Sequence, residues 1–266
     1  MRDLRLTSFA ASINRILNLP VTAFVKAVMQ SNCAISGGTM ITVYSLCGKD
    51  GIHYSPHVWK VIMALHHKQL DFEIIPVDFS TIREIENGAF KSVPVLRDGD
   101  RVLGDSFEIC EYLETAYPDA PSLFDGEGSR RMARFLESYC LTQLHPPLAV
   151  IAVMNMHNIM HESDQAYFRA KREERFGMSI EAMAEGGPEQ RKILRERLAP
   201  LRAILNDHPW IYGDTPLLPD YVAFSALQWC WVVGVRDVLE EDDSVRAWFA
   251  RCQDLFEGAA RNPAPH

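Results

Sequence analysis

The chain has 266 residues and a formal net charge of −8, and its 47% apolar and 23% charged residues are typical of a globular protein with one large or two modest domains. No apolar run reaches the ~18 residues of a membrane span, and no basic stripe could neutralise nucleic-acid phosphates. The six cysteines are scattered and form no C-x-x-C pair. This argues against a disulfide framework and favours a reducing, cytoplasmic setting.

Residues 1–39 differ from the rest of the chain in composition. They carry four basic residues against the single acid Asp3, and they end in Ser36-Gly37-Gly38. An acid-poor leader with arginine and serine resembles an organelle transit peptide. Met40, however, stands directly before the first predicted strand, which favours a true start at that residue. On either interpretation, this extension is expected to take no part in the chemistry.

The first predicted elements form a small α/β domain over residues 40–118. Residues 41–46 are β-branched and aromatic and predict a buried strand. Ser55 and Pro56 predict a helix start, because serine is a preferred N-cap and proline is favoured at the first helical position. In chain order there follow a strand (72–77), a short helical connection (80–87), a hairpin (93–96 and 101–103) and a helix (105–117) that Pro118 ends.

The second half of the chain predicts an all-helical domain. Residues 119–124 form a proline-rich linker, and no alternating strand pattern follows it over 125–266. Helices are expected over residues 132–153, 167–183, 189–205, 221–233 and 245–256.

Three motifs make residues 40–258 resemble the glutathione S-transferases. The first is Val93-Pro94 before the strand Val95-Leu96, and the second is Asp105-Ser106 at a helix start. The third is the run Gly213-Asp-Thr-Pro-Leu-Leu-Pro-Asp220, which is similar to the start of the family's buried helix.

Two positions depart from the family pattern. Leu217 replaces the usual Ser or Thr, which loses half of a reciprocal cap and leaves Asp220 a role in stability. Gln69 stands after the first helix, where the family commonly has glycine. If the backbone is left-handed at this position, a residue other than glycine is strained there.

The resemblance implies a thioredoxin-like α/β N-terminal domain followed by an all-α C-terminal domain, with glutathione as co-substrate. In the family, Pro94 would be cis, and Val93 would offer its backbone to the cysteinyl part of glutathione, as an added strand would. Ser106 and the free N–H groups of its helix would hold the γ-glutamyl carboxylate, and Asp105 would balance the γ-glutamyl ammonium. Lys91 is a candidate partner of the glycyl carboxylate. The resemblance also implies a homodimer.

Within the superfamily, the chain is most similar to bacterial glutathione-dependent β-etherases and related fungal enzymes. Short helical pieces carry this similarity: Ser55-Pro-His-Val-Trp-Lys60, Ala64-Leu-His-His-Lys68, Ala226-Leu-Gln-Trp229 and Glu241-Asp-Asp-Ser-Val-Arg-Ala-Trp248. It implies a serine-type enzyme of aromatic-compound metabolism or detoxification.

Ser55 is the predicted catalytic residue, because the glutathione thiol must become a thiolate before it attacks. The Ser55 hydroxyl would donate to the sulfur and stabilise the thiolate; alternatively, Ser55 only caps the helix. Tyr44 is a rival activator, although its mid-strand position favours the core. Cys47 lies eight residues before the helix and is interpreted as incidental. His53 and Tyr54 lie in the loop before Ser55 and could border the glutathione sulfur, and neither is assigned a role.

No metal site is predicted. His157 and His161 have helical i, i+4 spacing, but Asn158 stands where a zincin has Glu, so they are interpreted as ordinary helical histidines. Methionines 154, 156 and 160 favour core packing, although they, Tyr139, Trp229 and Trp231 could line an adaptable pocket.

Two functions remain open on the sequence. The first is a transferase that directs the glutathione thiolate at a small hydrophobic electrophile, with aryl β-ether cleavage as one version. The alternative is a non-catalytic binding or scaffold protein with the same fold. Together, Ser55, Val93-Pro94 and Asp105-Ser106 favour the enzyme.

Overall fold

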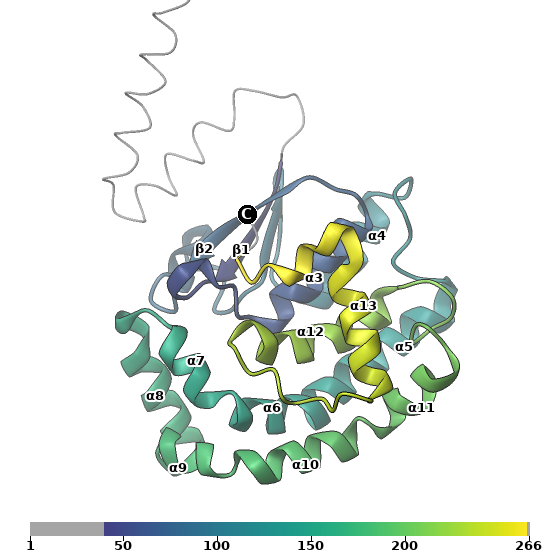
Figure 1. Cartoon of the computed structure of the whole chain (residues 1–266). Coiled ribbons are helices and arrows are strands. Elements are labelled where there is room, and N and C mark those ends of the chain that lie inside the picture. Colours follow the sequence, from purple (N-terminus) through teal and green to yellow (C-terminus); the bar gives the residue numbers. More distant parts are fainter. Residues whose placement is uncertain (1–39, 265–266) are drawn as a thin grey trace, which may run out of the picture. The chain divides into compact units, whose positions relative to one another are not determined.

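A four-stranded mixed sheet forms the first part of the fold in the computed structural model, which describes residues 40–264 (Figure 1). The strand order is β2-β1-β3-β4, where β1 is parallel to β2 and antiparallel to β3. The bounds are Ile41–Leu46 (β1), Phe72–Val77 (β2), Val95–Asp98 (β3) and Arg101–Leu103 (β4). Every residue of the central strand β1 is buried, as its apolar run predicts. The expectations for residues 1–39 lie outside the described residues.

Helix α3 (Pro56–His67) and helix α4 (Ser106–Ala116) accompany the sheet, and the predicted helical connection is the 3-10 segment Ile82–Gly88. A further 3-10 turn, Lys49–Gly51, lies in the loop after β1. Ser55 is the N-cap of α3, and Pro56 occupies the first turn, as predicted. Residues Val58 to Leu65 are all buried, so α3 is a core helix on every face.

The end of α3 confirms the expected strain at Gln69. Gln69 adopts a φ of 55°, in the left-handed region. Its N–H donates to the His66 carbonyl at 3.0 Å, and the Leu70 N–H donates to the Leu65 carbonyl at 3.1 Å. This pair of bonds is the Schellman arrangement, whose left-handed position favours glycine.

The helical part contains more breaks than the sequence predicted. Its elements are α5 (Gly126–Tyr139), the π-helical turn Cys140–Leu144, α6 (His145–Ile151), α7 (Val153–Ile159), α8 (Glu162–Phe176), α9 (Ile180–Glu185), α10 (Gly187–Arg197), α11 (Ala199–Asp207), α12 (Leu218–Val232), α13 (Ser244–Gly258) and the turn Ala259–Arg261.

The single helix predicted over 167–183 is wrong. Gly177 adopts a φ of 68° and ends α8, and the Ser179 side chain accepts from the Ala182 N–H at 3.2 Å to start α9. The predicted helix 132–153 also divides, because the π-helical turn interrupts it and prolines stand in the first turn of α6.

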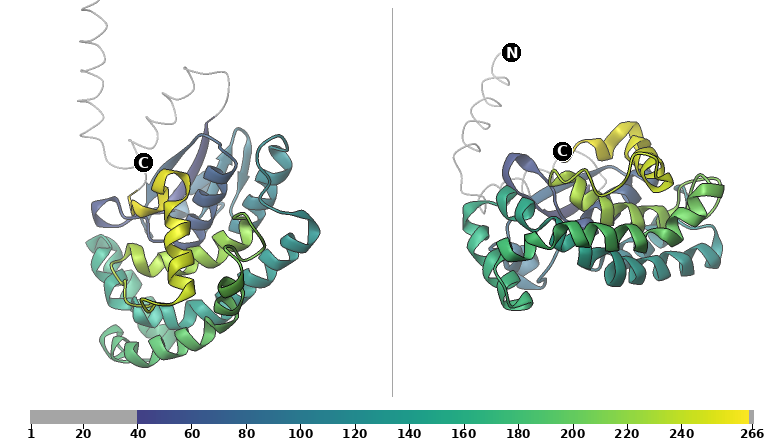
Figure 2. Two further views of the ribbon diagram at one scale, coloured as in Figure 1. Left: turned by 45° about the vertical axis from the view of Figure 1, so that its right-hand side comes forward. Right: turned by 60° about the horizontal axis from the view of Figure 1, so that its bottom comes forward.

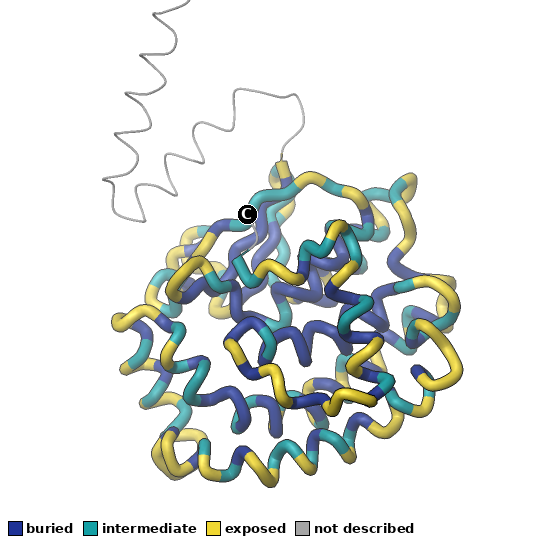
Figure 3. Tube along the Cα trace, viewed as in Figure 1, coloured by how far each residue is buried: buried dark blue, intermediate teal, exposed yellow. Residues whose placement is uncertain are grey.

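The buried helix α12 connects the sheet half to the helical half. It packs against α3 and α5, and Figure 1 shows α3 between the strands and α12. Nearly all its residues are buried, and the trace of α12 is mostly dark blue, the colour of buried residues, in Figure 3. Asp220, fully buried in its first turn, accepts from Leu217 N–H at 3.1 Å, from Ile211 N–H at 3.0 Å and from Trp248 Nε1 at 2.9 Å. Leu217 can return no side-chain bond, so only the expected half of the reciprocal cap is present.

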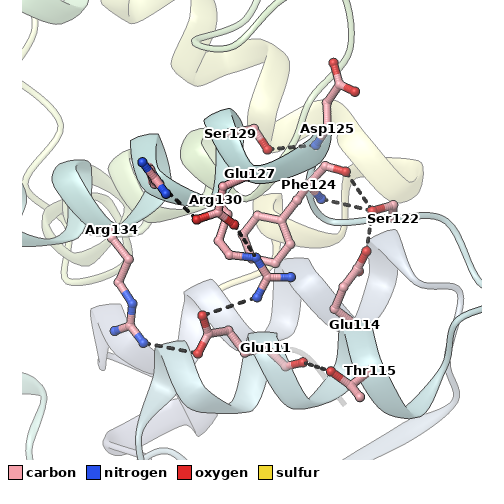
Figure 4. A network of polar contacts seen from close by, with 11 residues as sticks. Glu111, Glu114, Thr115, Ser122, Phe124, Asp125, Glu127, Ser129, Arg130 and Arg134 are labelled. Carbon is pink, nitrogen blue, oxygen red and sulfur yellow. Dashed lines mark hydrogen bonds and ion pairs between the residues drawn. The ribbon is translucent and has the colours of Figure 1, made fainter.

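Polar contacts fix the junction between α4 and α5 (Figure 4). Glu111 of α4 pairs with Arg130 at 3.4 Å and with Arg134 at 3.2 Å, both from α5. Glu114 accepts from the Leu123 N–H at 2.9 Å and from the Ser122 hydroxyl. The Glu114 contacts attach the proline-rich segment to α4, and the Glu111 pairs join α4 to α5.

The last described residues return to the loop after β1. The Pro263 carbonyl accepts from the His53 N–H at 2.9 Å, and the Ala260 carbonyl accepts from the Gln228 side chain at 2.6 Å. Figure 2 shows this yellow end of the chain beside the strands. Pro263 therefore contacts the loop that leads to Ser55, and Ala260 contacts α12.

Candidate functional site

A cavity of about 420 Å³ opens beside the start of α3 and contains Ser55 in its wall. Its sheet-side wall comes from the end of β1, the start of α3 and the loop after β2, and its other wall comes from the π-helical turn and helices α6, α7, α8 and α12. The lining residues are Leu46, Tyr54, Ser55, Pro56, His57, Phe79, Leu141, His145, Pro146, Ala149, Met156, Arg172, Arg175, Phe176 and Trp229. The wall is mainly apolar and aromatic, as expected for a small-molecule pocket.

Ser55 is 7% exposed and lies at the junction of the loop and α3. Its hydroxyl oxygen accepts from the Val58 N–H at 3.4 Å, which satisfies one orphan donor of the helix start. Because this oxygen acts as an acceptor, the hydroxyl proton is left for another group. The structure therefore combines the cap with a donor at the cavity wall.

The two rival activators do not line the cavity. Tyr44 is 2% exposed and donates to Glu86 Oε1 at 3.1 Å, and burial together with Glu86 raises the pKa of Tyr44 to about 12. Cys47 is buried, and desolvation raises the pKa of its thiol to about 11, with a smaller contribution from Asp78. A protonated thiol is a poor nucleophile.

The loop residues before Ser55 have different environments. The backbone of His53 accepts from Trp59 Nε1 at 2.8 Å, and its Nδ1 lies 2.9 Å from the Ser45 hydroxyl. Tyr54 lines the cavity, and its buried hydroxyl has no hydrogen-bond partner among the described residues. Burial raises the pKa of Tyr54 above its ordinary value, so the phenol stays protonated.

Two histidines of the cavity were not predicted. The rings of His57 and His145 lie 5.6 Å apart between centroids, and His145 lies 5.7 Å from the Trp229 ring. Burial lowers the pKa of His57 to about 4 and that of His145 to about 3, and the Lys60 charge adds to both shifts. Both imidazoles are therefore neutral near pH 7. Their sequence context, next to Pro56 and Pro146, gave no signal that they would meet.

The Val93-Pro94 peptide bond is cis, as the resemblance implied. The pairing of β1 with β3 ends at Tyr44 and Val95, so Val93 lies just beyond the ladder. Val93 and Pro94 are buried but do not line the cavity.

Asp105 and Ser106 form the start of α4, with Asp105 as the N-cap. Asp105 Oδ1 accepts from the N–H groups of Phe107 and Glu108, each at 2.9 Å. Ser106 is the first helical residue and is 5% exposed. Its Oγ accepts from Lys60 Nζ at 3.0 Å, and the same ammonium pairs with Glu137 of α5 at 2.5 Å. Sequence reasoning missed Lys60 and Glu137, because only the fold brings α3, α4 and α5 together.

Lys91, His157 and His161 do not line the cavity. Lys91 is exposed, and its side chain has no polar partner among the described residues. His157 belongs to α7 and His161 precedes α8, so the expectation that both lie on one helix face is wrong. Within residues 40–264 no cluster of three metal-ligating side chains is found. Of the proposed pocket residues, Met156 and Trp229 line the cavity, whereas Trp231 lines a separate one.

Within the described part of the chain, no helix is long and apolar enough to cross a membrane.

Residues 51–121 match the N-terminal domain of glutathione S-transferases, and residues 132–255 match their C-terminal domain. A glutathione S-transferase from Hyoscyamus muticus is 26% identical over 220 residues, which cover 79% of this chain and 93% of that protein. One from Dianthus caryophyllus is 33% identical over 134 residues, which cover 48% of this chain and 60% of the relative's length.

Solved structures share the fold. A glutathione transferase from Phanerochaete chrysosporium superimposes with a TM-score of 0.73 at 22% identity, covering 81% of this chain and 97% of that one. A glutathione S-transferase of Ceriporiopsis subvermispora, in complex with glutathione, gives a TM-score of 0.69 at 21% identity, with coverages of 82% and 97%. The two domain matches together span most of the chain, and the mixed sheet followed by helices agrees with them. The chain belongs to the glutathione S-transferase family.

Proposed function

We propose that this protein is a glutathione-dependent transferase in which Ser55 stabilises the glutathione thiolate for attack on a hydrophobic electrophile. The observation that carries the proposal is the position of Ser55, whose hydroxyl lies in the wall of an apolar cavity at the N-terminus of α3. A helix N-terminus and a hydroxyl donor both favour a thiolate over a thiol.

Glutathione would bind along the edge formed by Val93 and the start of α4. Val93 lies just beyond the β1–β3 ladder, where its backbone groups are available to an added strand. Ser106 and the first N–H groups of α4 suit the γ-glutamyl carboxylate, and Asp105 suits the ammonium beside it. The exposed Lys91 is the proposed partner of the glycyl carboxylate. The Ceriporiopsis protein shares the fold and is in complex with glutathione, which supports glutathione as the ligand.

The proposed reaction is nucleophilic substitution. The sulfur forms a bond to an electrophilic carbon, and the leaving group departs with the bonding electrons. With an aryl β-ether, the C–O bond breaks and a phenolate leaves. The mainly apolar walls of the cavity, with Phe79, Met156 and Trp229, would hold the aromatic part of such a substrate.

Ser55→Ala is the experiment that tests the proposal. Loss of a charge-assisted hydrogen bond of roughly 1.5–3 kcal/mol should raise the pKa of the bound glutathione thiol by about one to two units. Turnover of chlorodinitrobenzene should therefore fall at neutral pH and recover as the pH rises. The measurement is thiolate absorbance of the binary complex against pH, for the parent and the variant.

Ser179→Ala is the matched control. Ser179 caps α9 by the same kind of bond, to the Ala182 N–H, and does not line the cavity. Each alanine variant should lower stability by about 0.5–2 kcal/mol through the lost cap, but only Ser55→Ala should move the thiol titration. Coincident titration curves for the parent and Ser55→Ala would leave Ser55 a helix cap. Glutathione binding without turnover of any electrophile would favour the non-catalytic alternative.

We infer that the two domains span residues 40–118 and 125–266, with residues 119–124 as the linker between them. We also infer that the protein is located in the cytoplasm. Two copies of the chain are expected to form a homodimer with two-fold symmetry. Sedimentation at micromolar concentration should give twice the chain mass, and a monomer there would contradict the dimer.

A further inference from the structure

The cavity beside Ser55 contains two positive charges and no negative one. Arg172 and Arg175 of α8 line it, and among the described lining residues none is acidic. The two positions are three residues apart, so both side chains leave the same face of the helix. Arg172 is half-buried and Arg175 is exposed, and both belong to the lining of a cavity whose other walls are mainly apolar.

Neither guanidinium has an ion pair or a hydrogen bond within the described part of the chain, whereas the other cations of α8 are paired. Arg169 pairs with Glu181 at 2.7 Å and with Glu173 at 3.1 Å, and Lys171 pairs with Glu174 at 2.8 Å. The contrast within one helix shows that carboxylates neutralise those two cations but not the two at the cavity.

Aromatic rings support the two guanidiniums and leave their N–H groups open. Arg172 lies 5.0 Å from the centre of the Phe168 ring, and Arg175 lies 5.5 Å from that of Phe176. A guanidinium stacked on a ring still presents its edge donors, which match a carboxylate. Burial lowers the pKa of Arg172, with a smaller contribution from the Arg175 charge, and a bound anion would oppose this shift by favouring the charged guanidinium.

The histidines of the cavity add no positive charge near pH 7. The pKa of His57 is about 4 and that of His145 about 3, because both rings are buried and lie near Lys60. Arg172 and Arg175 are thus the charged groups that a ligand meets there, with neutral aromatic and imidazole rings around them.

We infer that the second substrate of this cavity is an aromatic carboxylate, whose ring lies against Trp229 and His145 and whose carboxylate is held by Arg172 and Arg175. The inference rests on the proposed function, in which the glutathione sulfur attacks from the Ser55 side. With 4-(chloromethyl)benzoate as probe, sulfur bonds to the benzylic carbon, chloride leaves with the bonding electrons, and the thiol proton passes to solvent.

The test compares naphthalene-2-carboxylate with naphthalene-2-carboxamide, which have nearly the same shape and differ in charge. Calorimetry measures each Kd at pH 7, with and without saturating glutathione. Charge-assisted bonds predict that the parent binds the carboxylate at least tenfold tighter than the amide. The preference should shrink as salt is raised.

Arg172→Gln with Arg175→Gln should remove the preference for the carboxylate and leave the Kd of the amide unchanged. Lys171→Gln is the matched control, because it removes one positive charge from the same helix outside the cavity, and it should keep the preference. In parallel, kcat/KM for 4-(chloromethyl)benzoate should fall at least tenfold in the double variant, whereas that for its methyl ester should not.

Equal affinities for the carboxylate and the amide in the parent would overturn the inference, whatever the variants do. A double variant that loses glutathione affinity and keeps the carboxylate preference would also overturn it, because the arginines would then hold glutathione's own carboxylate. A parent that binds no glutathione would instead refute the proposed function, and the glutathione-free titrations would still decide the charge preference of the cavity.

Discussion

At the scale of single residues, the buried ammonium of Lys60 determines how Ser106 can act. An ammonium only donates, so the Ser106 oxygen accepts from Lys60 Nζ and its own proton remains free. If Ser106 holds the γ-glutamyl carboxylate, Lys60 fixes the direction of that proton without touching glutathione. Lys60 would then be a positioning residue.

Lys60→Met should weaken glutathione binding through Ser106. The expected loss is about fivefold to tenfold, or roughly 1 kcal/mol, because the hydroxyl loses its fixed orientation and its polarising neighbour. Calorimetry should show the loss in the parent background but no further loss in a Ser106→Ala background, since coupled residues are not additive.

Glu137 supplies the control for this variant. Removing Lys60 alone leaves the Glu137 carboxylate, 15% exposed, without its closest partner and destabilises the fold. Lys60→Met with Glu137→Gln removes both charges and should regain stability without regaining glutathione affinity. Recovery of affinity together with stability would make Lys60 merely structural.

The sequence predicted single residues well where the signal was local. Ser55 follows from its place before Pro56, because capping depends on neighbours in the chain. Lys60 with Glu137, and His57 with His145, were missed because each pair joins elements about eighty residues apart. Arg172 and Arg175 were missed because their charge-rich stretch also fits an ordinary solvated helix face.

At the scale of elements, the end of α3 carries a residue that its backbone disfavours. Gln69 occupies the left-handed position of a Schellman motif with a φ of 55°. A side chain there costs about 1 kcal/mol relative to glycine. Gln69→Gly should therefore raise the free energy of unfolding by roughly that amount, less the entropy that glycine adds to the unfolded chain.

Denaturant titration of the parent and Gln69→Gly measures the gain. Gly177→Gln is the inverse experiment, because Gly177 ends α8 with a φ of 68° and a Cβ there would have open space. That variant should lose stability through the backbone alone. A Gln69→Gly protein less stable than the parent would show that contacts of the Gln69 side chain outweigh its strain.

Element boundaries show where local signals fail. The strands and α3 were predicted closely, since apolar β-branched runs and a Ser-Pro start are local patterns. The helical half was divided wrongly at the π-helical turn, at Gly177 and at Leu198, where the helix predicted over 189–205 separates into α10 and α11. Charged, amphipathic segments give a continuous helical pattern, and tertiary packing decides where they break.

At the scale of the whole molecule, α3 and α12 tie the sheet half to the helical half. His67 of α3 lies 2.7 Å from the Tyr221 hydroxyl of α12, and the Phe79 N–H donates to Asp164 of α8 at 2.9 Å. Because α3 is buried between the two halves, neither half can expose its core without breaking the other. Residues 41–264 should therefore unfold as one cooperative unit.

Asp220→Asn tests that cooperativity from a point far from the sheet. The carboxylate accepts from Leu217, Ile211 and Trp248, and an amide nitrogen would face at least one of these donors. The unsatisfied buried donor should cost about 1–3 kcal/mol of unfolding free energy. Native-state hydrogen exchange should show β1 and α12 amides losing protection by the same free energy.

Asp254→Asn is the control, because Asp254 belongs to an exposed ion pair of α13. It should leave the unfolding free energy and the amide protection unchanged. Loss confined to α12 and α13 would show that the sheet half keeps its structure when the helical half opens, and glutathione binding would then persist after α12 melts.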